Sequence, residues 1–265
     1  MHNQNNIPEK IRCKNCNLIY KGNFCPRCGQ NATVKRFDFK YFLKESFLSS
    51  LDIENGFFPS IKALTLTPGK SIRQYLAGKR LSLTIPMRYL IVMGAIAAIV
   101  SIRYKIFVDE GSNEAPLALL NFMDKGFWDY ATEFLTVLNI VTVPVFAYFT
   151  FIFFRKSGYN YSENLVMNMY ITAHQLFILL VFFPVIELFL SNKIFIIYVY
   201  SIVTISYNFW AYLSFFRVRN PKGVFTTIIA LAASYAVQLF FNYGIYLILK
   251  VFNLIPHLKN IDLPG

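Results

Sequence analysis

The chain of 265 residues is 55% hydrophobic and 18% aromatic, and only 15% of its residues are charged, against about a quarter in an ordinary soluble domain. This composition excludes a water-soluble globule, because the polar residues could not cover its surface. The net charge of +12 is concentrated near the N-terminus, since residues 1–88 hold 15 of the 26 Lys and Arg and 5 of the 14 Asp and Glu. A basic head beside an apolar block favours anionic lipid headgroups as a partner and gives little support to nucleic acid.

All four cysteines lie in the head, as two Cys-x2-Cys pairs separated by eight residues. The pairs are Cys13–Cys16 and Cys25–Cys28. Each pair makes a tight turn that directs two sulfurs to one point, and two such turns supply the tetrahedron of thiolates that Zn²⁺ prefers in a structural site. We therefore predict a zinc ribbon over residues 1–36, too small to fold without its metal. Disulfides, an iron–sulfur cluster and metal-free knuckles are the alternatives, and disulfides would need an oxidising compartment.

Residues 37–85 read as an amphipathic juxtamembrane connector. Asp38 can cap a Phe-rich amphipathic helix that runs to about Leu51, lying either in the membrane interface or against the cytoplasmic end of a bundle. Further on, Thr67 as N-cap, Pro68 at the first position and Gly78 as a stop predict a short helix over 68–77.

The connector contains Gly69-Lys70-Ser71, a fragment of a phosphate-binding loop. The complete motif needs a glycine five residues earlier, where this chain has Leu64, and a preceding strand, which the pattern lacks. Nucleotide binding is therefore rejected, although a lipid phosphate near Lys70 stays compatible with the sequence. The candidate headgroup-binding residues are Lys70, Arg73, Lys79, Arg80 and Arg88.

The order of these motifs resembles a known family. Two Cys-x2-Cys pairs ending in Gly-Gln are followed by Thr-Pro-Gly-Lys-x-Ile-Arg-x-Tyr-Leu-x-Gly-Lys-Arg and a Pro-x-Arg-Tyr-Leu entry into the membrane. This pattern, over residues 13–91 and more weakly at Tyr161-x-Glu163-x-Leu-Val, resembles an uncharacterised bacterial family of integral membrane proteins with an N-terminal zinc ribbon, a domain of unknown function. The resemblance implies a shared architecture and brings no activity with it.

The rest of the chain is predicted to be an all-α polytopic membrane domain. A span needs about 20 apolar residues, and residues 86–252 supply five such stretches, before a short tail at 253–265. The expected spans are 86–107, 134–154, 165–190, 194–216 and 224–249.

Lys and Arg placement predicts the orientation. The head, Arg155-Lys156 and the basic stretch 217–222 fall on one side, and the acidic loop 109–133 falls on the other. By the positive-inside rule we expect the N-terminus in the cytoplasm and the C-terminus outside. Together with the bacterial resemblance, this predicts a multi-pass protein of the cytoplasmic (inner) membrane.

Polar side chains inside the predicted spans are the candidate midplane residues. His174, Gln175, Asn208 and Gln238 fall at similar depth, where polar groups must face the bundle or water. They predict either a site for a proton, ion or headgroup, or hydrogen bonds that hold the helices together.

No catalytic motif accompanies these features, so the sequence favours a non-enzymatic protein. We expect an adaptor or sensor whose cytoplasmic zinc ribbon binds a protein partner. The alternatives are a small transporter or permeation protein that uses the midplane residues, and a protein that handles anionic lipids.

Overall fold

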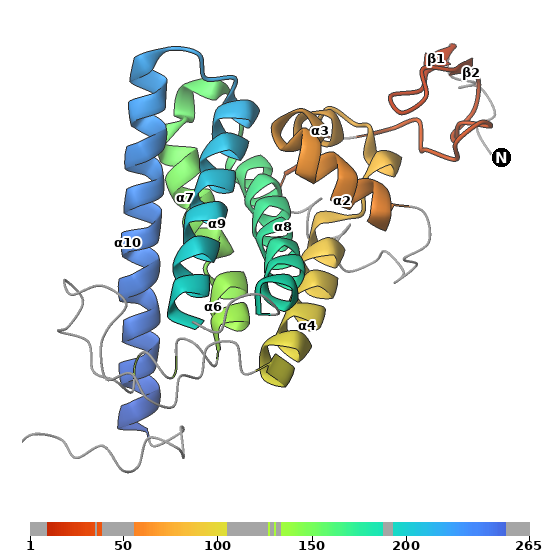
Figure 1. Cartoon of the computed structure of the whole chain (residues 1–265). Coiled ribbons are helices and arrows are strands. Elements are labelled where there is room, and N and C mark those ends of the chain that lie inside the picture. The colour runs from red at the N-terminus through yellow and green to blue at the C-terminus, as the bar shows by residue number, and fades with distance from the viewer. Residues whose placement is uncertain are drawn as a thin grey trace, which may run out of the picture.

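The computed structural model describes residues 10–34, 36–38, 56–104, 127, 130, 134–187 and 193–252. Its described part is mostly helical, with a small β-hairpin at the N-terminal side (Figure 1). The helix predicted from Asp38 to Leu51 lies outside the described residues beyond Asp38 itself, as does the tail at 253–265. The elements are β1 (Ile11–Arg12), β2 (Ile19–Tyr20), α2 (Phe57–Leu66), α3 (Pro68–Leu76), η1 (Arg80–Ser82), α4 (Pro86–Tyr104), α6 (Leu135–Val141), α7 (Val143–Phe153), η3 (Arg155–Ser157), α8 (Tyr161–Glu187), α9 (Lys193–Phe216) and α10 (Pro221–Val251).

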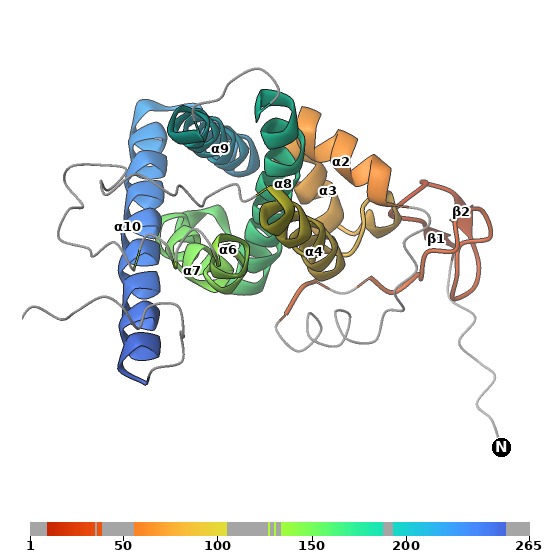
Figure 2. The ribbon, with the colours of Figure 1, turned by 60° about the horizontal axis from the view of Figure 1, so that its bottom comes forward.

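Helix α8 is the centre of the bundle. It packs against α4 on one side and α7 on the other, and it also contacts α9, α2 and α3. Figure 2 shows α10 at the edge of the bundle, on the side away from the β-hairpin. The buried core accordingly follows α8, through residues such as Val166, Tyr170 and Leu176.

The short helix α3 forms where the residues at its two ends predict it. Pro68 occupies the first turn, Ala77 is the C-cap, and Gly78 follows with φ +114°, which a residue with a Cβ rarely adopts. The Thr67 hydroxyl does not cap α3; it bonds to the Ser71 hydroxyl and to the carbonyl of Ala63 in α2. Thr67 thus joins two consecutive helices.

The second predicted span is a helix with a break. Helices α6 and α7 meet at Thr142, two residues before Pro144. Proline has no N–H to donate to the carbonyl four residues earlier, so the regular ladder is interrupted there. The Thr142 hydroxyl instead donates to the carbonyl of Leu138 at 2.9 Å. The chain still runs on as one apolar stretch over Thr136–Phe153.

Four apolar helical stretches in the described part of the chain are long enough to cross a membrane: Arg80–Val100, Thr136–Phe153, Tyr161–Phe182 and Pro221–Val251. Their outward faces carry large exposed apolar side chains, including Ile99, Phe240 and Ile248, whereas Asn164 and Ser234 are buried. Apolar groups outside and hydrogen-bonding groups inside are what a helix bundle in lipid requires. The chain therefore has the features of a multi-pass membrane protein.

The helices alternate in direction. In Figure 1, the connection from α7 to α8, the connection from α9 to α10, helix α3 and the β-hairpin all lie at one end of the bundle. Helix α9, the predicted fourth span, runs through the bundle beside α8 and α10. The three basic segments of the sequence therefore share an end of the molecule.

Candidate functional site

The two Cys-x2-Cys pairs fold as two copies of one turn. In the first, the N–H of Asn17 bonds to the carbonyl of Cys13 at 3.0 Å; in the second, the N–H of Gly29 bonds to the carbonyl of Cys25 at 2.8 Å. Asn17 and Gly29 both have positive φ, of 63° and 75°. Asparagine and glycine are the residues that tolerate this conformation best, so each turn is encoded by the residue that follows its second cysteine.

These turns bring the four sulfurs together. All four lie within 4.8 Å of one another, and the Cys13–Cys28 and Cys16–Cys25 pairs are each 3.5 Å apart. Thiolates around a tetrahedral Zn²⁺, with Zn–S of about 2.3 Å, are about 3.8 Å apart. No disulfide links them. The four-cysteine cluster therefore fits a closed metal site with no open position.

The thiols of the cluster differ in their pKa. Burial opposes the ionisation of Cys28, but hydrogen bonds from the backbone of Gln30, from the Asn15 amide and with two other cysteines outweigh that effect and lower the pKa of Cys28 to about 7. A backbone hydrogen bond at Leu18 favours ionisation of Cys16, but burial and hydrogen bonds with the other three cysteines outweigh it and raise the pKa of Cys16 to about 12. Because a metal binds the thiolate and not the thiol, metal binding must release the proton of Cys16.

The cluster is attached to the bundle through Gln30. Its amide nitrogen donates to the carbonyl of Gly78 at 2.8 Å, and its amide oxygen accepts from the N–H of Arg80 at 3.2 Å. The Gln30 side chain is buried, and its two bonds satisfy both halves of the amide. We call these two hydrogen bonds the Gln30 clamp; they join the second cysteine turn to the end of α3.

A second attachment lies at the start of α8. Asn160 and Glu163 form a reciprocal cap, in which each side chain accepts from the other residue's backbone N–H, at 2.8 and 2.9 Å. Arg36 then binds both carboxylate oxygens of Glu163, at 2.7 Å each, and donates to the carbonyl of Gly158. The Asn160 amide donates to the carbonyl of Phe37. The segment after the ribbon is thus held on α8.

Between the two attachments lies an aromatic stack. Phe37 is buried, its ring stacks on Tyr75 of α3 at 5.8 Å, and the guanidinium of Arg80 sits 4.0 Å above it. This arrangement places Arg80, one of the predicted headgroup residues, in a protein contact.

The predicted headgroup residues do not form one site. Lys70 and Arg73 line a cleft of about 540 Å³ together with Arg217 from the end of α9. Lys79 lines a different cleft, and Arg88 is a half-buried residue of α4. The structure therefore brings together two of the five and adds a residue that the sequence did not single out.

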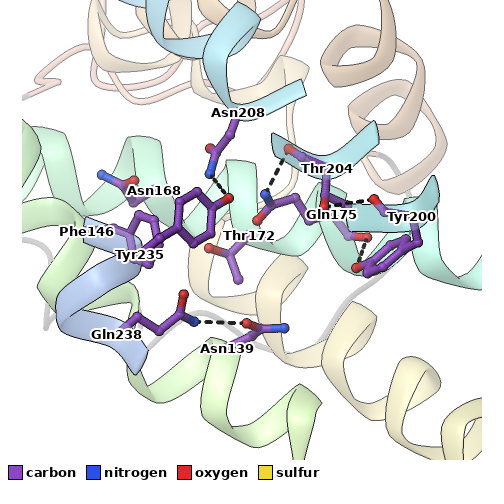
Figure 3. A pocket seen from close by; sticks show the side chains of 10 residues that line it. All are labelled: Asn139, Phe146, Asn168, Thr172, Gln175, Tyr200, Thr204, Asn208, Tyr235 and Gln238. Atoms are coloured by element: carbon purple, nitrogen blue, oxygen red, sulfur yellow. Dashed lines mark hydrogen bonds between the residues drawn. The ribbon is translucent and has the colours of Figure 1, made fainter. Parts of the chain in front are cut away.

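A polar cavity of about 70 Å³ lies inside the bundle (Figure 3). Three of the four predicted midplane residues line it: Gln175 from α8, Asn208 from α9 and Gln238 from α10. The space is large enough for a few water molecules, since one needs at least about 10–15 Å³. None of the described residues that line it is charged. The structure thus brings these three polar residues together inside the bundle.

The hydrogen bonds of the cavity leave one acceptor free. The amide of Gln238 donates to Asn139 and Thr142 at the break between α6 and α7, and the amide of Asn208 donates to the hydroxyl of Tyr235 at 2.9 Å. The Asn208 carbonyl oxygen is buried and has no hydrogen-bond partner among the described residues. A buried oxygen beside a polar cavity calls for water or another donor.

His174 faces the other side of α8. Its Nδ1 lies 3.2 Å from the hydroxyl of Tyr89 in α4, and its Nε2 lies 3.2 Å from the hydroxyl of Thr65 in α2. Its ring packs against Tyr207. The grouping of His174 with Asn208 and Gln238 in one layer is thus corrected: adjacent helix positions point about 100° apart, so Gln175 reaches the cavity and His174 does not.

The sequence did not identify three contact residues, although each lies in a local pattern that could have indicated it. Gln30 follows the second cysteine turn directly, and Asn160-x-x-Glu163 has the spacing of a capping box. The sequence alone does not show that Gln30 attaches the ribbon to the end of α3, or that Asn160 and Glu163 attach the segment after the ribbon to α8.

Comparison with known families matches one segment of the membrane-facing part of the chain. A family described as "Protein of unknown function (DUF3667)" matches residues 54–98, which include α2, α3, η1 and most of α4. No curated protein and no solved structure matches the chain. The chain is thus similar to a family of unknown function over this one segment, and it also carries a four-cysteine cluster and apolar helices.

Proposed function

We propose that the chain is a non-enzymatic, multi-pass protein of the bacterial cytoplasmic membrane, and that it acts as an adaptor or sensor. Its five long helical segments span the bilayer, α9 included, with the N-terminus in the cytoplasm and the C-terminus outside. The cysteines Cys13, Cys16, Cys25 and Cys28 hold a structural Zn²⁺ in residues 1–36. The folded ribbon binds a cytoplasmic partner. Loss of the metal from the ribbon, or binding of the partner, then changes the packing of the bundle.

The Gln30 clamp is the observation that carries this proposal. A ribbon connected to the bundle only through the chain would not require a buried side chain that hydrogen-bonds to Gly78 and Arg80. Because small zinc ribbons unfold when the metal leaves, we expect the clamp to be lost with the metal. Metal loss or partner binding at the ribbon would therefore loosen the end of α3, which packs on α9.

Hydrogen exchange of the full-length protein in detergent tests this coupling. Chelation should raise amide exchange in residues 72–83 and 158–165 of the wild type. Gln30→Ala should retain zinc but show raised exchange in 72–83 before chelation, with little further change after it. Exchange in both segments that does not respond to chelation would overturn the sensor proposal.

Partner binding has its own test. Proteins captured by the wild type should differ from those captured by the variant with all four cysteines changed to serine, and Gln30→Ala serves as a control that keeps the metal. If the wild type and the four-serine variant capture identical sets, the adaptor role is wrong.

The polar cavity favours a second candidate, permeation of a small neutral solute or water. The free acceptor on Asn208 and the break beside Gln238 are its support. Flux into liposomes should fall in Asn208→Leu and stay unchanged in His174→Phe, which lies outside the cavity. Absent flux, or flux indifferent to Asn208→Leu, would remove this candidate.

A further inference from the structure

Three cations from two distant parts of the chain meet at one cleft. Lys70 and Arg73 come from α3, and Arg217 comes from the turn after α9. None of the three is paired with a carboxylate in the described part of the chain. The nearby carboxylate of Glu163 is already bound by Arg36 through two hydrogen bonds. The cleft therefore holds excess positive charge.

The guanidinium of Arg73 is fixed in place. One of its nitrogens donates to the carbonyls of Ser214 and Phe215 at the C-terminal end of α9. These bonds satisfy carbonyls that the helix end leaves open, and they leave the other N–H groups of Arg73 free. Burial, and then the charge of Arg217, lower the pKa of Arg73. The two arginines thus lie close enough to repel each other when the cleft is empty.

Arg217 adopts a conformation that favours glycine. Its φ is +54°, and the N–H of Val218 bonds to the carbonyl of Leu213, as in a Schellman motif. A glycine would terminate α9 at this position without the penalty that a Cβ brings. Because arginine is strained in this backbone conformation, its presence indicates that the charged side chain has a function that glycine could not supply.

The cleft also offers hydroxyl donors and an apolar wall. Ser157 and Tyr159 line it from the connection before α8, and Phe215 and Phe216 line it from α9. A phosphate group has oxygens for both guanidinium and hydroxyl donors, and arginine pairs with phosphate in a planar, bidentate way. At the end of the bundle where the basic segments gather, both phospholipid headgroups and soluble phosphates can reach this place.

We infer that the cleft between α3 and the end of α9 is a binding site for a phosphate group, held by Lys70, Arg73 and Arg217. The ligand is either the headgroup of an anionic phospholipid or a free phosphate. The anion relieves the repulsion between the arginines and ties α3 to α9. This site shares no residue with the metal cluster or with the polar cavity.

Arg217→Gly gives a selective test, because it removes the charge and suits the backbone. Arg219→Gln is the matched control, since Arg219 is an exposed residue on the same connection and does not line this cleft. Retention of phosphatidylglycerol is measured by native mass spectrometry of full-length protein from nanodiscs. Thermal stabilisation by inorganic phosphate is measured against chloride at equal ionic strength.

A lipid site predicts retained phosphatidylglycerol in the wild type and in Arg219→Gln, with at least about fivefold less in Arg217→Gly. A free-phosphate site predicts no retained lipid, but stabilisation by phosphate that Arg217→Gly abolishes. Arg217→Gly should melt no lower than the wild type in chloride, which shows that the fold is kept. Absence of both effects, or equal loss in the two variants, would overturn the inference.

Discussion

Gly69 of α3 lies directly against the backbone of Phe215 in α9. A methyl group added at Gly69 would overlap the nitrogen of Phe215 and the carbonyl carbon of Ser214. The glycine of the apparent phosphate-loop fragment is thus used for close helix packing. It lets α3 approach the end of α9 and brings Arg73 within reach of the carbonyls there.

Gly69→Ala should therefore destabilise the protein, although alanine is the better helix former. Overlap with backbone atoms cannot be relieved by a side-chain rotation, and overpacking costs about 1–3 kcal/mol. The measurement is the melting temperature in detergent. Gly244→Ala is the control, because its added methyl meets nothing within 4 Å, and it should be neutral or stabilising by up to about 1 kcal/mol. Equal melting temperatures for Gly69→Ala and the wild type would contradict the close packing.

The metal cluster predicts one zinc per chain, measured by elemental analysis of the purified full-length protein. Cys25→Ser should lose the metal, since it removes a buried ligand, and Ile19→Ser on the exposed side of the ribbon should keep it. Zinc binding supplies about 10–16 kcal/mol in small zinc domains, so the variant without metal should be cleaved by protease within residues 10–34. Iron in place of zinc, or full zinc content in Cys25→Ser, would refute the assignment.

The Arg36–Glu163 pair predicts unequal effects of removing its two members. The Arg36 side chain is 63% exposed and that of Glu163 only 6%. Arg36→Met leaves the buried carboxylate of Glu163 without its charged partner, so this change should cost about 2–3 kcal/mol. Glu163→Ala leaves an exposed guanidinium that water solvates, so its cost should be mainly that of the lost cap of α8, about 1 kcal/mol. The double variant should match Glu163→Ala in melting temperature; a lower value would mean that Arg36 acts elsewhere.

Local signals predicted what depends on local sequence. The cysteine turns follow from the residues at 17 and 29, α3 follows from Pro68 and Gly78, and the four apolar stretches follow from hydropathy. In contrast, the partners of polar side chains depend on the order in which helices pack. From the sequence, His174 and Asn208 lie at the same depth in the membrane. Whether they meet depends on the helix packing, in which α4 covers one face of α8 and α9 covers another, and the sequence does not give that packing.

The cleft lined by Lys70, Arg73 and Arg217 could not be predicted for the same reason, because it forms only where α3 packs on α9. Arg217 reaches α3 because the backbone turns with positive φ after α9, and no pattern in the sequence marks an arginine for that conformation. Lys70 and Arg73 were predicted as candidates from charge alone, whereas Arg80 has the same charge and is used inside the protein, above Phe37. Charge in a connector therefore identifies candidates but does not separate ligand contacts from internal ones.

The position of His174 leads to a prediction about its contact with Tyr89. His174→Phe leaves the buried hydroxyl of Tyr89 without its partner, and Tyr89→Phe leaves Nδ1 of the histidine without one. Each single change should cost about 1–3 kcal/mol, because an unsatisfied buried group carries its full desolvation penalty.

The double variant should cost less than the sum of the two single changes, by at least about 0.5 kcal/mol, since it leaves neither group unsatisfied. Melting temperatures of the four proteins in detergent measure this coupling. His174→Phe combined with Tyr212→Phe is the control, because Tyr212 bonds to Asn168 and not to the histidine; those two effects should add. Additive effects for His174 and Tyr89 as well would mean that their hydrogen bond does not hold α4 to α8, and that the histidine has another role.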